Sequence, residues 1–543
     1  MLGSLGTFWI SLARQRCTVA VLLFGLPVIL RLSILGSYPK PEPVIHDEFG
    51  HLLLADTLRY VRFANPPHAL SEFFDAIYVI QHPTYSASYP PGQALMLLTG
   101  HLLFGDPWAG VLLANGFLCL SVWWALRAWV GPGWALLGGL FVLARVALFG
   151  DWMNTYWGGS LAGIAGSFVF GALPRLEGAI RENLPKPAPH ILTYAGLLGA
   201  GLGLHLLIRP FETVSLGLCV VAYLALTTHS RAALFRSSRT YWSLCVSAAI
   251  PISCAIGLLL LQNYQVTSNW RKMPYVLTRE QYGVPQTFVF QKAAVPQLPL
   301  RQEQLANYKV QLRRHDSTLR TRIAERMYLM YFDAGLGLTL SLLLSLFTFR
   351  HKQFRWALGM AFLPLLLSLT YGYFYTHYIS GFIAIWMVLA LLGLEWLSQA
   401  EWNGRAIGAF AVILVSLLTL HHSGRIYAAY LLRELLPATM QRGFIANTTD
   451  DLVSKRPWFK RLPVERTLRA RRGRHLVFVT ELPSSHESTL EWVYNAADID
   501  ASTIVWAHSL GPQKDEQLKR YYGSTRSVWL VNRDIGVSTL RSY

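Results

Sequence analysis

The sequence predicts a mainly α-helical membrane protein: a polytopic bundle of about eleven spans followed by a small C-terminal α/β domain. Hydrophobic residues make up 53% of the 543 residues and charged residues only 14%, whereas soluble domains carry about 25% charged residues. Apolar stretches of about 17 to 22 residues recur along most of the chain, the length that crosses a ~30 Å hydrocarbon core. Strand-like segments appear only near the C-terminus. This pattern excludes a soluble enzyme, a disordered protein and a secreted disulfide scaffold.

The net charge of +18 fits a membrane protein, since Lys and Arg concentrate in the loops that flank spanning helices. No long basic run is interleaved with aromatic residues, so we expect no nucleic-acid partner. The five cysteines all lie in apolar segments and form no readable disulfide framework or CxxC metal site.

The predicted spans share an apolar composition and a membrane-crossing length. They lie near 17–36, 108–126, 134–150, 158–176, 191–208, 211–228, 241–262, 330–349, 356–376, 378–397 and 406–422. The first follows the basic run Arg14-Gln15-Arg16 and has no small-residue cleavage site after it, so we interpret it as an uncleaved helix.

A twelfth apolar stretch, 92–105, is too short for a span and suits an interfacial helix. When this stretch is left out of the count, the short basic loops and the N-terminus all fall on one side, which the positive-inside rule makes cytoplasmic. The polar regions 37–107, 263–328 and 423–543 then lie on the extracytoplasmic side.

Residues 1–422 form the predicted transmembrane domain, and 423–543 form a linker and a small α/β domain. The predicted strands of this domain are 475–480, 503–507 and 527–531, and its predicted helices are 487–497 and 512–522. A basic linker, 461–474, precedes them. We interpret this domain as a structural or acceptor-orienting cap rather than as a separate catalytic unit.

The acidic pair Asp47-Glu48 is the most informative feature, because it lies just beyond the outer end of the first span. Asp47 stands where an N-cap is expected for an amphipathic helix, which gives it a purely structural alternative. An acidic pair at the membrane boundary is costly if it faces lipid, which favours a polar cavity instead. Adjacent helical residues point about 100° apart, so the two carboxylates would serve different tasks.

Two further segments offer polar groups on the same predicted side. The outer loop 150–159 contains Asp151 among aromatic residues that could stack on a sugar. Arg145, within the preceding span, either snorkels outward or pairs with a carboxylate in a cavity. The segment Ser88-Tyr89-Pro90-Pro91 leads into the short apolar helix, where proline suits a first turn.

An acidic pair after the first span, a Pro-Pro entry to an interfacial helix and an acidic residue in the next outer loop resemble the C-type glycosyltransferase superfamily. This superfamily includes protein O-mannosyltransferases and the aminoarabinose transferase of lipid A. The resemblance implies a bacterial inner-membrane enzyme that moves a sugar from a polyprenyl-phosphate carrier to an extracytoplasmic lipid, glycan or protein. It implies catalytic roles for Asp47, Glu48 and Asp151, and it matches His377-Tyr378 to an Arg-Tyr or His-Tyr pair.

Two departures separate this sequence from the aminoarabinose-transferase branch. That branch has Glu-Lys before its Pro-Pro, where this chain has Ser88-Tyr89. The usual proline after the His-Tyr pair is also absent. We therefore expect another branch of the superfamily, with a different source of positive charge for the carrier phosphate.

The expected reaction is a single displacement with inversion in which Asp47 takes the proton of the acceptor hydroxyl. Asp151 would orient the acceptor or the sugar, or hold a divalent cation together with Glu48. The leaving phosphate needs positive charge, and we expect it from Arg209, Arg271 or Lys272, with His377 as the next candidate. Alternatively, Arg209 pairs with Glu212, and Arg271-Lys272 lie among lipid head groups.

Two other functions compete with glycosyl transfer. A transporter or flippase for a lipid-linked or anionic solute would need charges near the bilayer midplane. Arg31 and Arg145 are its candidates, but both lie nearer the outer ends of their spans, and no internal repeat is visible. A noncatalytic partner in envelope glycolipid assembly would bind other proteins through the C-terminal domain.

Overall fold

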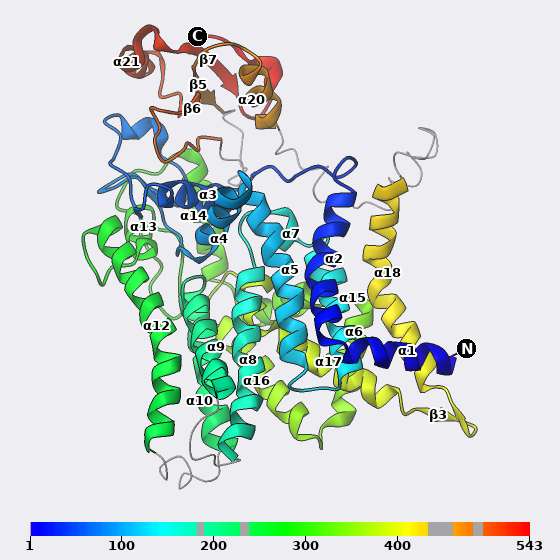
Figure 1. The fold of residues 1–543 in the computed structure, drawn as a ribbon. Helices are drawn as coiled ribbons and strands as arrows, with labels where there is room; N and C mark the ends of the chain where they lie inside the picture. Colours follow the sequence, from blue (N-terminus) through cyan, green and yellow to red (C-terminus); the bar gives the residue numbers. More distant parts are fainter. Residues whose placement is uncertain (1, 182–188, 228–237, 433–459, 482–491) are drawn as a thin grey trace.

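The computed structural model describes residues 2–181, 189–227, 238–432, 460–481 and 492–543. A bundle of apolar helices forms one end of the molecule, and the polar loops and a small α/β domain form the other (Figure 1). Among the described residues, seven helices are long and apolar enough to cross a membrane by length and composition. The protein is therefore an integral membrane protein.

Each of the eleven predicted spans coincides with a helix. Only seven helices of the described part of the chain have the length and hydropathy expected of a span, so the number of membrane crossings stays a prediction. The helices of the bundle are α2 (Arg16–Ser33), α5 (Pro107–Leu126), α6 (Pro132–Val142) with its continuation η2 (Leu143–Ala147), α8 (Ser160–Arg181), α9 (Pro189–Leu206), α10 (Pro210–Thr227), α12 (Ser238–Thr267), α15 (Leu319–Ser345), α16 (Lys352–Ser368), α17 (Ile383–Leu397) and α18 (Gly408–Leu432). The short helix α1 (Leu2–Arg14) precedes them.

Burial distinguishes the inner helices from the outer ones. Helices α5 and α17 are mostly buried and carry much of the apolar core, whereas few residues of α12 are fully buried, although one side of it packs on α9. An apolar helix that is exposed along its length requires lipid around it. The core of the bundle therefore lies around α5, α8 and α17, and α12 lies at its rim.

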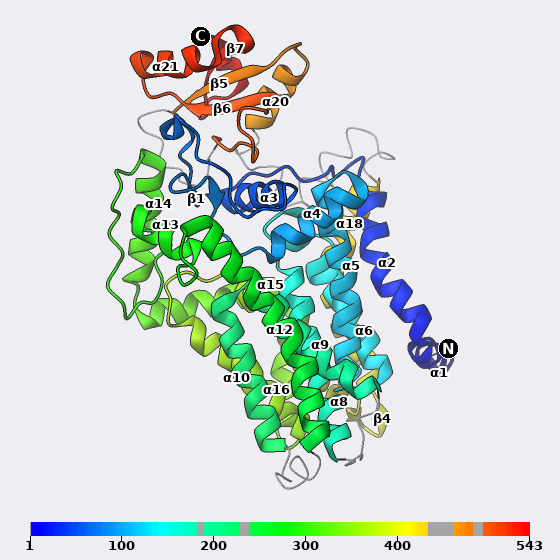
Figure 2. The ribbon, with the colours of Figure 1, turned by 60° about the vertical axis from the view of Figure 1, so that its left-hand side comes forward.

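Four helices of the predicted outer regions gather between the bundle and the C-terminal domain (Figure 2). They are α3 (His46–Leu58), α4 (Gly92–Phe104), α13 (Pro274–Tyr282) and α14 (Gln302–His315). Between α3 and α4 lie η1 (Ser71–Phe74) and a two-stranded ribbon of β1 (Val79–Ile80) and β2 (Ser86–Ala87). Helix α4 is the short apolar stretch that the sequence predicted to be interfacial, and its first residue donates a hydrogen bond to Leu207 at the end of α9.

The C-terminal region contains a four-stranded sheet in the order β6-β5-β7-β8. Strands β5 (His475–Thr480), β6 (Ile504–His508) and β7 (Ser527–Asn532) are parallel and lie where strands were predicted. Strand β8 (Arg541–Ser542) pairs antiparallel with β7. Helix α21 (Pro512–Tyr522) confirms the predicted helix 512–522, and α20 (Arg461–Arg469) occupies much of the stretch expected to be a basic linker.

The predicted helix 487–497 is wrong where the structure describes it, since 492–497 are not helical; residues 487–491 lie outside the described part of the chain. Asn495 explains the difference. Its side chain donates to the carbonyl of Trp506 (2.8 Å) and accepts from the Trp506 amide (2.9 Å). The Asn495 side chain thus makes the pair of hydrogen bonds to Trp506 that the backbone of a neighbouring strand would make. Helical spacing in the sequence does not predict this contact.

The C-terminal domain packs directly on the loop that contains Asp47. Tyr494 stacks on Phe49 with ring centroids 4.3 Å apart, and its hydroxyl donates to the Ile77 carbonyl (3.1 Å). The amide of Ala497 donates to the Asp56 carboxylate at 2.8 Å. Region 37–107 and the described residues of the C-terminal domain, 460–481 and 492–543, therefore lie at the same end of the bundle.

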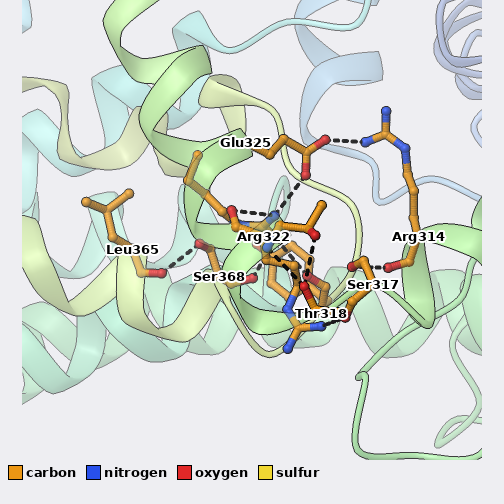
Figure 3. Close-up of polar contacts among 10 residues, drawn as sticks. Arg314, Ser317, Thr318, Arg322, Glu325, Leu365 and Ser368 are labelled. Carbon is orange, nitrogen blue, oxygen red and sulfur yellow. Dashed lines mark hydrogen bonds and ion pairs between the residues drawn. The ribbon is translucent and has the colours of Figure 1, made fainter.

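Hydrogen bonds at the start of α15 fix the loop that follows α16, as Figure 3 shows. Glu325 accepts from Arg314 (2.7 Å) and Arg326 (3.0 Å). The Arg326 guanidinium also donates to the carbonyls of Ser368 (3.0 Å) and Tyr371 (2.7 Å). Helix α15 begins at Leu319 instead of the predicted 330 because Thr318 caps it. This network holds segment 369–378 against α14.

A buried ionic cluster joins α14 to the C-terminal domain. The Glu303 carboxylate is 1% exposed, and its Oε1 lies 3.7–3.8 Å from Arg301, Arg533 and His508. Arg533 also donates to Glu481 at 2.6 Å. Atoms of Glu303, Glu481 and His508 lie close enough to hold a metal ion. However, two arginines already balance the two carboxylates, so we interpret the group as an ion-pair cluster.

This cluster predicts a pH dependence of stability that comes from two opposing groups. Burial and the neighbouring Glu303 raise the pKa of Glu481 from 4.5 to about 7, so its contribution weakens as the pH rises through that range. Burial lowers the pKa of His508 from 6.5 to about 3, so its contribution weakens as the pH falls below 6.5. Each effect is on the order of 3 kcal/mol over its full range.

We expect Glu481→Gln to leave the His508 effect unopposed, so that the thermal unfolding midpoint of the purified protein falls more steeply between pH 6.5 and 4.5 than in the unmodified chain. His508→Gln should make that fall shallower. The measurement is thermal unfolding in detergent across this range. Parallel pH profiles for both variants and the unmodified chain would contradict the assignment.

Candidate active site

One cavity of about 1580 Å³ lies where the helix bundle meets the polar loops. Its walls come from distant parts of the chain, including α3, the loop after η2, the start of α10, α13, α14, α15 and segment 371–380. Six of the residues singled out in the sequence line it: Asp47, Arg145, Asp151, Arg209, His377 and Tyr378. The fold thus brings together groups that lie up to about 330 residues apart.

Asp47 is the second residue of α3, whose N-cap is Ile45. The structural alternative from the sequence, Asp47 as the N-cap, is therefore wrong. The Asp47 carboxylate lines the cavity, where its Oδ1 accepts a hydrogen bond from the Tyr89 hydroxyl. Its Oδ2 has no hydrogen-bond partner among the residues described by the structure.

Glu48 performs the capping that was expected of Asp47. Its Oε2 accepts from the amides of Val44 (2.8 Å) and Ile45 (3.2 Å), and its Oε1 accepts from the amide of Tyr156 (3.1 Å). The side chain is buried and does not line the cavity. Because both oxygens bind backbone amides, Glu48 is placed to hold α3 against loop 150–159 instead of binding a cation with Asp151.

Tyr89 is a site residue that the sequence analysis missed. It belongs to the Ser88-Tyr89-Pro90-Pro91 segment, which was interpreted only as a helix entry. Its ring packs so closely on α3 that a Cβ at Gly50 would lie 2.4 Å from it. Glycine at position 50 therefore allows Tyr89 to reach Asp47 and fix the orientation of its carboxylate.

Arg209 is the last of the three residues between α9 and α10 and lines the cavity. Its guanidinium stands over the ring of Tyr378, 4.4 Å from the centroid. No ion pair within 4.0 Å joins it to Glu212, although the structure describes both side chains. Glu212 instead accepts a hydrogen bond from Tyr371 at 3.3 Å. Arg209 therefore offers positive charge to the cavity.

Arg145 lines the cavity, where the Asp333 carboxylate is an electrostatic neighbour. It donates to the carbonyls of Phe332 (3.3 Å) and Asp333 (2.7 Å) at a break in α15. The break is at Gly335, where φ is +68° and a Cβ would lie 2.9 Å from the arginine. Arg145 thus satisfies carbonyls that the broken helix leaves without amide partners.

Asp151 is exposed at the start of α7 (Asp151–Asn154) and lines the cavity together with Asp333. Asp333 is a second carboxylate that the sequence analysis did not identify, and it accepts a hydrogen bond from Thr376. The His377 ring stacks between Trp157 and Tyr375, with centroids 5.9 and 5.6 Å away. This part of the cavity combines carboxylates with aromatic faces.

Three other candidate arginine and lysine residues lie away from the cavity. Lys272 binds Glu280, and Arg271 is exposed. Arg31 is fully buried and donates to Asn154 (2.9 Å) and to the carbonyls of Tyr38 (2.7 Å) and Pro39 (2.8 Å). It therefore fixes the end of α2 and does not provide the intramembrane charge that a transporter would need.

Burial shifts the pKa values of the histidines and of Tyr275 beside Asp47 and Arg209. Burial lowers the pKa of His51 to about 4, and burial also lowers the pKa of His46, against the effect of Asp47. Burial raises the pKa of Tyr275 well above its usual value; Asp47 raises it further and Arg209 opposes this. Tyr275 is thus within electrostatic reach of both the carboxylate and the guanidinium.

Comparison with known proteins gives a fold but no sequence family. No protein-family model and no curated protein matches the sequence. The structure is similar to the apo crystal structure of ArnT from Cupriavidus metallidurans, at 14% identity over 94% of this chain and 92% of that one, with a TM-score of 0.51. The structure of ArnT bound to undecaprenyl phosphate is 13% identical over 95% of this chain and 92% of that one, with a TM-score of 0.48. An apo oligosaccharyltransferase from Archaeoglobus fulgidus is 13% identical over 86% of this chain and 62% of that one, with a TM-score of 0.39.

The match to apo ArnT extends over nearly the full length of both chains and shows a shared fold. The resemblance that was based on the acidic pair and the Pro-Pro entry is thus confirmed as a fold similar to that of ArnT. Its low identity carries no residue role from one protein to the other.

Glu48→Gln should destabilise the protein, because it removes the charge from a buried group that accepts three backbone hydrogen bonds. We expect a loss of about 1–3 kcal/mol, measured as a lower thermal unfolding midpoint in detergent without any lipid substrate. Asp47→Asn is the matched control and should unfold close to the unmodified temperature. A Glu48→Gln midpoint equal to that of the control would contradict the capping role.

Proposed function

We propose that this protein is a membrane glycosyltransferase that moves a sugar from a polyprenyl phosphate to an acceptor at the loop-bearing end of the bundle. The observation that carries the proposal is the presence of Asp47 and Arg209 in one cavity. A carboxylate and a guanidinium, both at helix ends next to an apolar bundle, are the two charges that such a transfer needs. The shared fold with ArnT supports the same class of function.

In the proposed reaction, the acceptor oxygen attacks the anomeric carbon while its proton passes to Asp47. The new bond forms as the bond between the anomeric carbon and the phosphate oxygen breaks, and the polyprenyl phosphate leaves. Arg209 stabilises the charge that grows on this phosphate. Tyr89 positions the Asp47 carboxylate, and attack opposite the leaving group inverts the anomeric centre.

The walls of the cavity fit a donor with a lipid tail and a polar head. Apolar side chains of α6, α15 and α17, such as Phe141, Leu342 and Met387, line its bundle side. Polar and aromatic groups line its loop side. In this proposal the loop-bearing end faces the extracytoplasmic space of a bacterial inner membrane, and the C-terminal domain helps to orient the acceptor.

Asp47→Asn keeps the shape and hydrogen-bonding ability of the side chain but removes the proton acceptor. We expect glycan transfer to fall about 10²–10⁴-fold, while binding of undecaprenyl phosphate changes little. The measurement is mass spectrometry of membrane glycans and lipids from cells that express each form, with an empty-vector strain to define the product. Near-normal product from a well-expressed variant would exclude Asp47 as the base.

Arg209→Gln should weaken binding of undecaprenyl phosphate about 10- to 100-fold, because a charged hydrogen-bond donor is worth about 1.5–3 kcal/mol. Arg271→Gln changes the same residue type on an exposed surface outside the cavity and should bind like the unmodified protein. Titration of the lipid into purified protein measures both. A larger effect at position 271 than at 209 would place the phosphate elsewhere.

A further inference from the structure

A closed ring of hydrogen bonds surrounds the backbone of Arg209, at the junction of α9 and α10. The Arg209 amide donates to the carbonyl of His205 at 2.7 Å. The Arg209 carbonyl accepts from the Thr213 hydroxyl at 2.8 Å, and that hydroxyl lies 2.8 Å from Nδ1 of His205. The amide of Thr213 donates to the same carbonyl at 3.0 Å. The two sides of Arg209 are thus tied to each other through His205 and Thr213.

The direction of these bonds follows from the chemistry of the groups. A carbonyl can only accept, so the single proton of the Thr213 hydroxyl goes to Arg209. The hydroxyl must then accept from His205, which requires a proton on Nδ1 of the imidazole. His205 is fully buried in the last turn of α9, and its Nε2 has no hydrogen-bond partner among the described residues. Within the described part of the chain, the hydrogen bond of this buried ring is therefore the one to Thr213.

The bond from His205 determines where the Thr213 hydroxyl can point. A threonine hydroxyl rotates about its own C–O bond and can choose among acceptors. Once it accepts from His205, its proton is aimed at the Arg209 carbonyl, and successive hydrogen bonds in such a chain strengthen one another. Because the amide and the carbonyl of Arg209 both belong to the ring, the ring also sets the direction in which the Arg209 side chain leaves the backbone.

The imidazole of His205 also packs on the segment that carries Tyr378. A Cβ at Gly381, three residues after Tyr378, would lie 2.5 Å from Nε2 of His205. Glycine at position 381 therefore allows η4 (Thr376–Phe382) to approach the ring closely. The guanidinium of Arg209 stands 4.4 Å from the centroid of the Tyr378 ring. His205 thus contacts both the turn that carries Arg209 and the segment that carries the aromatic ring beside it.

This arrangement matters because of what Arg209 faces. A charge stabilises a phosphate best when it is held in place before the ligand arrives, since no reorganisation is then needed. An arginine side chain is long and can adopt many rotamers. Fixing the backbone at its base and the ring beside its guanidinium restricts that freedom in the empty cavity.

We propose that His205 and Thr213 are positioning residues that orient Arg209 toward the phosphate of the polyprenyl carrier. Neither residue lines the cavity, so both act through Arg209 and not by touching the lipid. This inference rests on the proposed function, in which Arg209 binds that phosphate. It extends the phosphate site by two residues, and it requires that their effect disappears when Arg209 is replaced.

The test measures binding of undecaprenyl phosphate and of undecaprenol, the same lipid without its phosphate, to the purified full-length protein in detergent. Thr213→Val keeps the size of the side chain and removes the hydroxyl. It should weaken binding of undecaprenyl phosphate about three- to tenfold, the range for one hydrogen bond, and leave binding of undecaprenol unchanged. Thr213→Ser keeps the hydroxyl and should bind both lipids like the unmodified protein.

A second pair of variants and a matched control complete the set. His205→Leu removes the donor to Thr213 and should reproduce the effect of Thr213→Val. His205→Asn keeps an N–H as far along the side chain as Nδ1 and should restore binding. Thr193 makes the same kind of bond outside the cavity, since its hydroxyl donates to the Pro189 carbonyl at 3.1 Å at the start of α9. Thr193→Val should therefore bind both lipids like the unmodified protein.

A double-mutant cycle separates positioning from a general structural role. In the Arg209→Gln background, Thr213→Val should change binding of undecaprenyl phosphate by about twofold at most. An equal loss in both backgrounds overturns the positioning role, and so does a Thr213→Ser protein that binds as weakly as Thr213→Val.

The remaining outcomes distinguish the two proposals. Unchanged phosphate-lipid binding by Thr213→Val, in a protein whose Arg209→Gln variant binds weakly, overturns the positioning role and leaves the transferase proposal standing. Equal binding of undecaprenyl phosphate and undecaprenol by the unmodified protein removes the phosphate contact of Arg209 and overturns both proposals.

Discussion

The cost of placing charge in hydrocarbon fixes where the chemistry of this protein can occur. The polar groups of the cavity, such as Asp47, Asp151 and Arg209, lie at helix ends or in the turns between helices on one side of the bundle. Where a polar backbone does interrupt a helix, at Gly335, an arginine side chain satisfies the exposed carbonyls. The bundle is thus an apolar support, and the reactive groups collect where it meets the loops.

This constraint also explains how much the sequence could predict. Spans and strands follow from local composition, and the side of each loop follows from the number of preceding spans and the positive-inside rule. This loop assignment placed Asp47, Asp151, Arg209 and His377 at the same end. However, knowing the side of the membrane on which a loop lies does not reveal whether its side chains line a cavity or the outer surface. Arg271 and Lys272 were placed at this end in the same way, but Lys272 binds Glu280 and Arg271 is exposed outside the cavity.

The contacts that the sequence did not reveal join residues far apart in the chain. Tyr89 reaches Asp47 across 42 residues, and Glu48 accepts the amide of Tyr156 across 108. Within a helix, spacing indicates which residues share a face, but nothing in the sequence indicates which distant segment packs on that face. The Asn495 contact with β6 is another example.

Helix α14 belongs to two sites at once. Glu303 is in the cluster beneath the C-terminal domain, and Asn307, one turn further along, lines the cavity. Residues four positions apart share one face of a helix, so the ion pairs that hold Glu303 also help to fix the part of α14 that carries Asn307. The C-terminal domain is consequently a structural part of the pocket. A shortened chain that lacks it would lose the support of that wall as well as a cap.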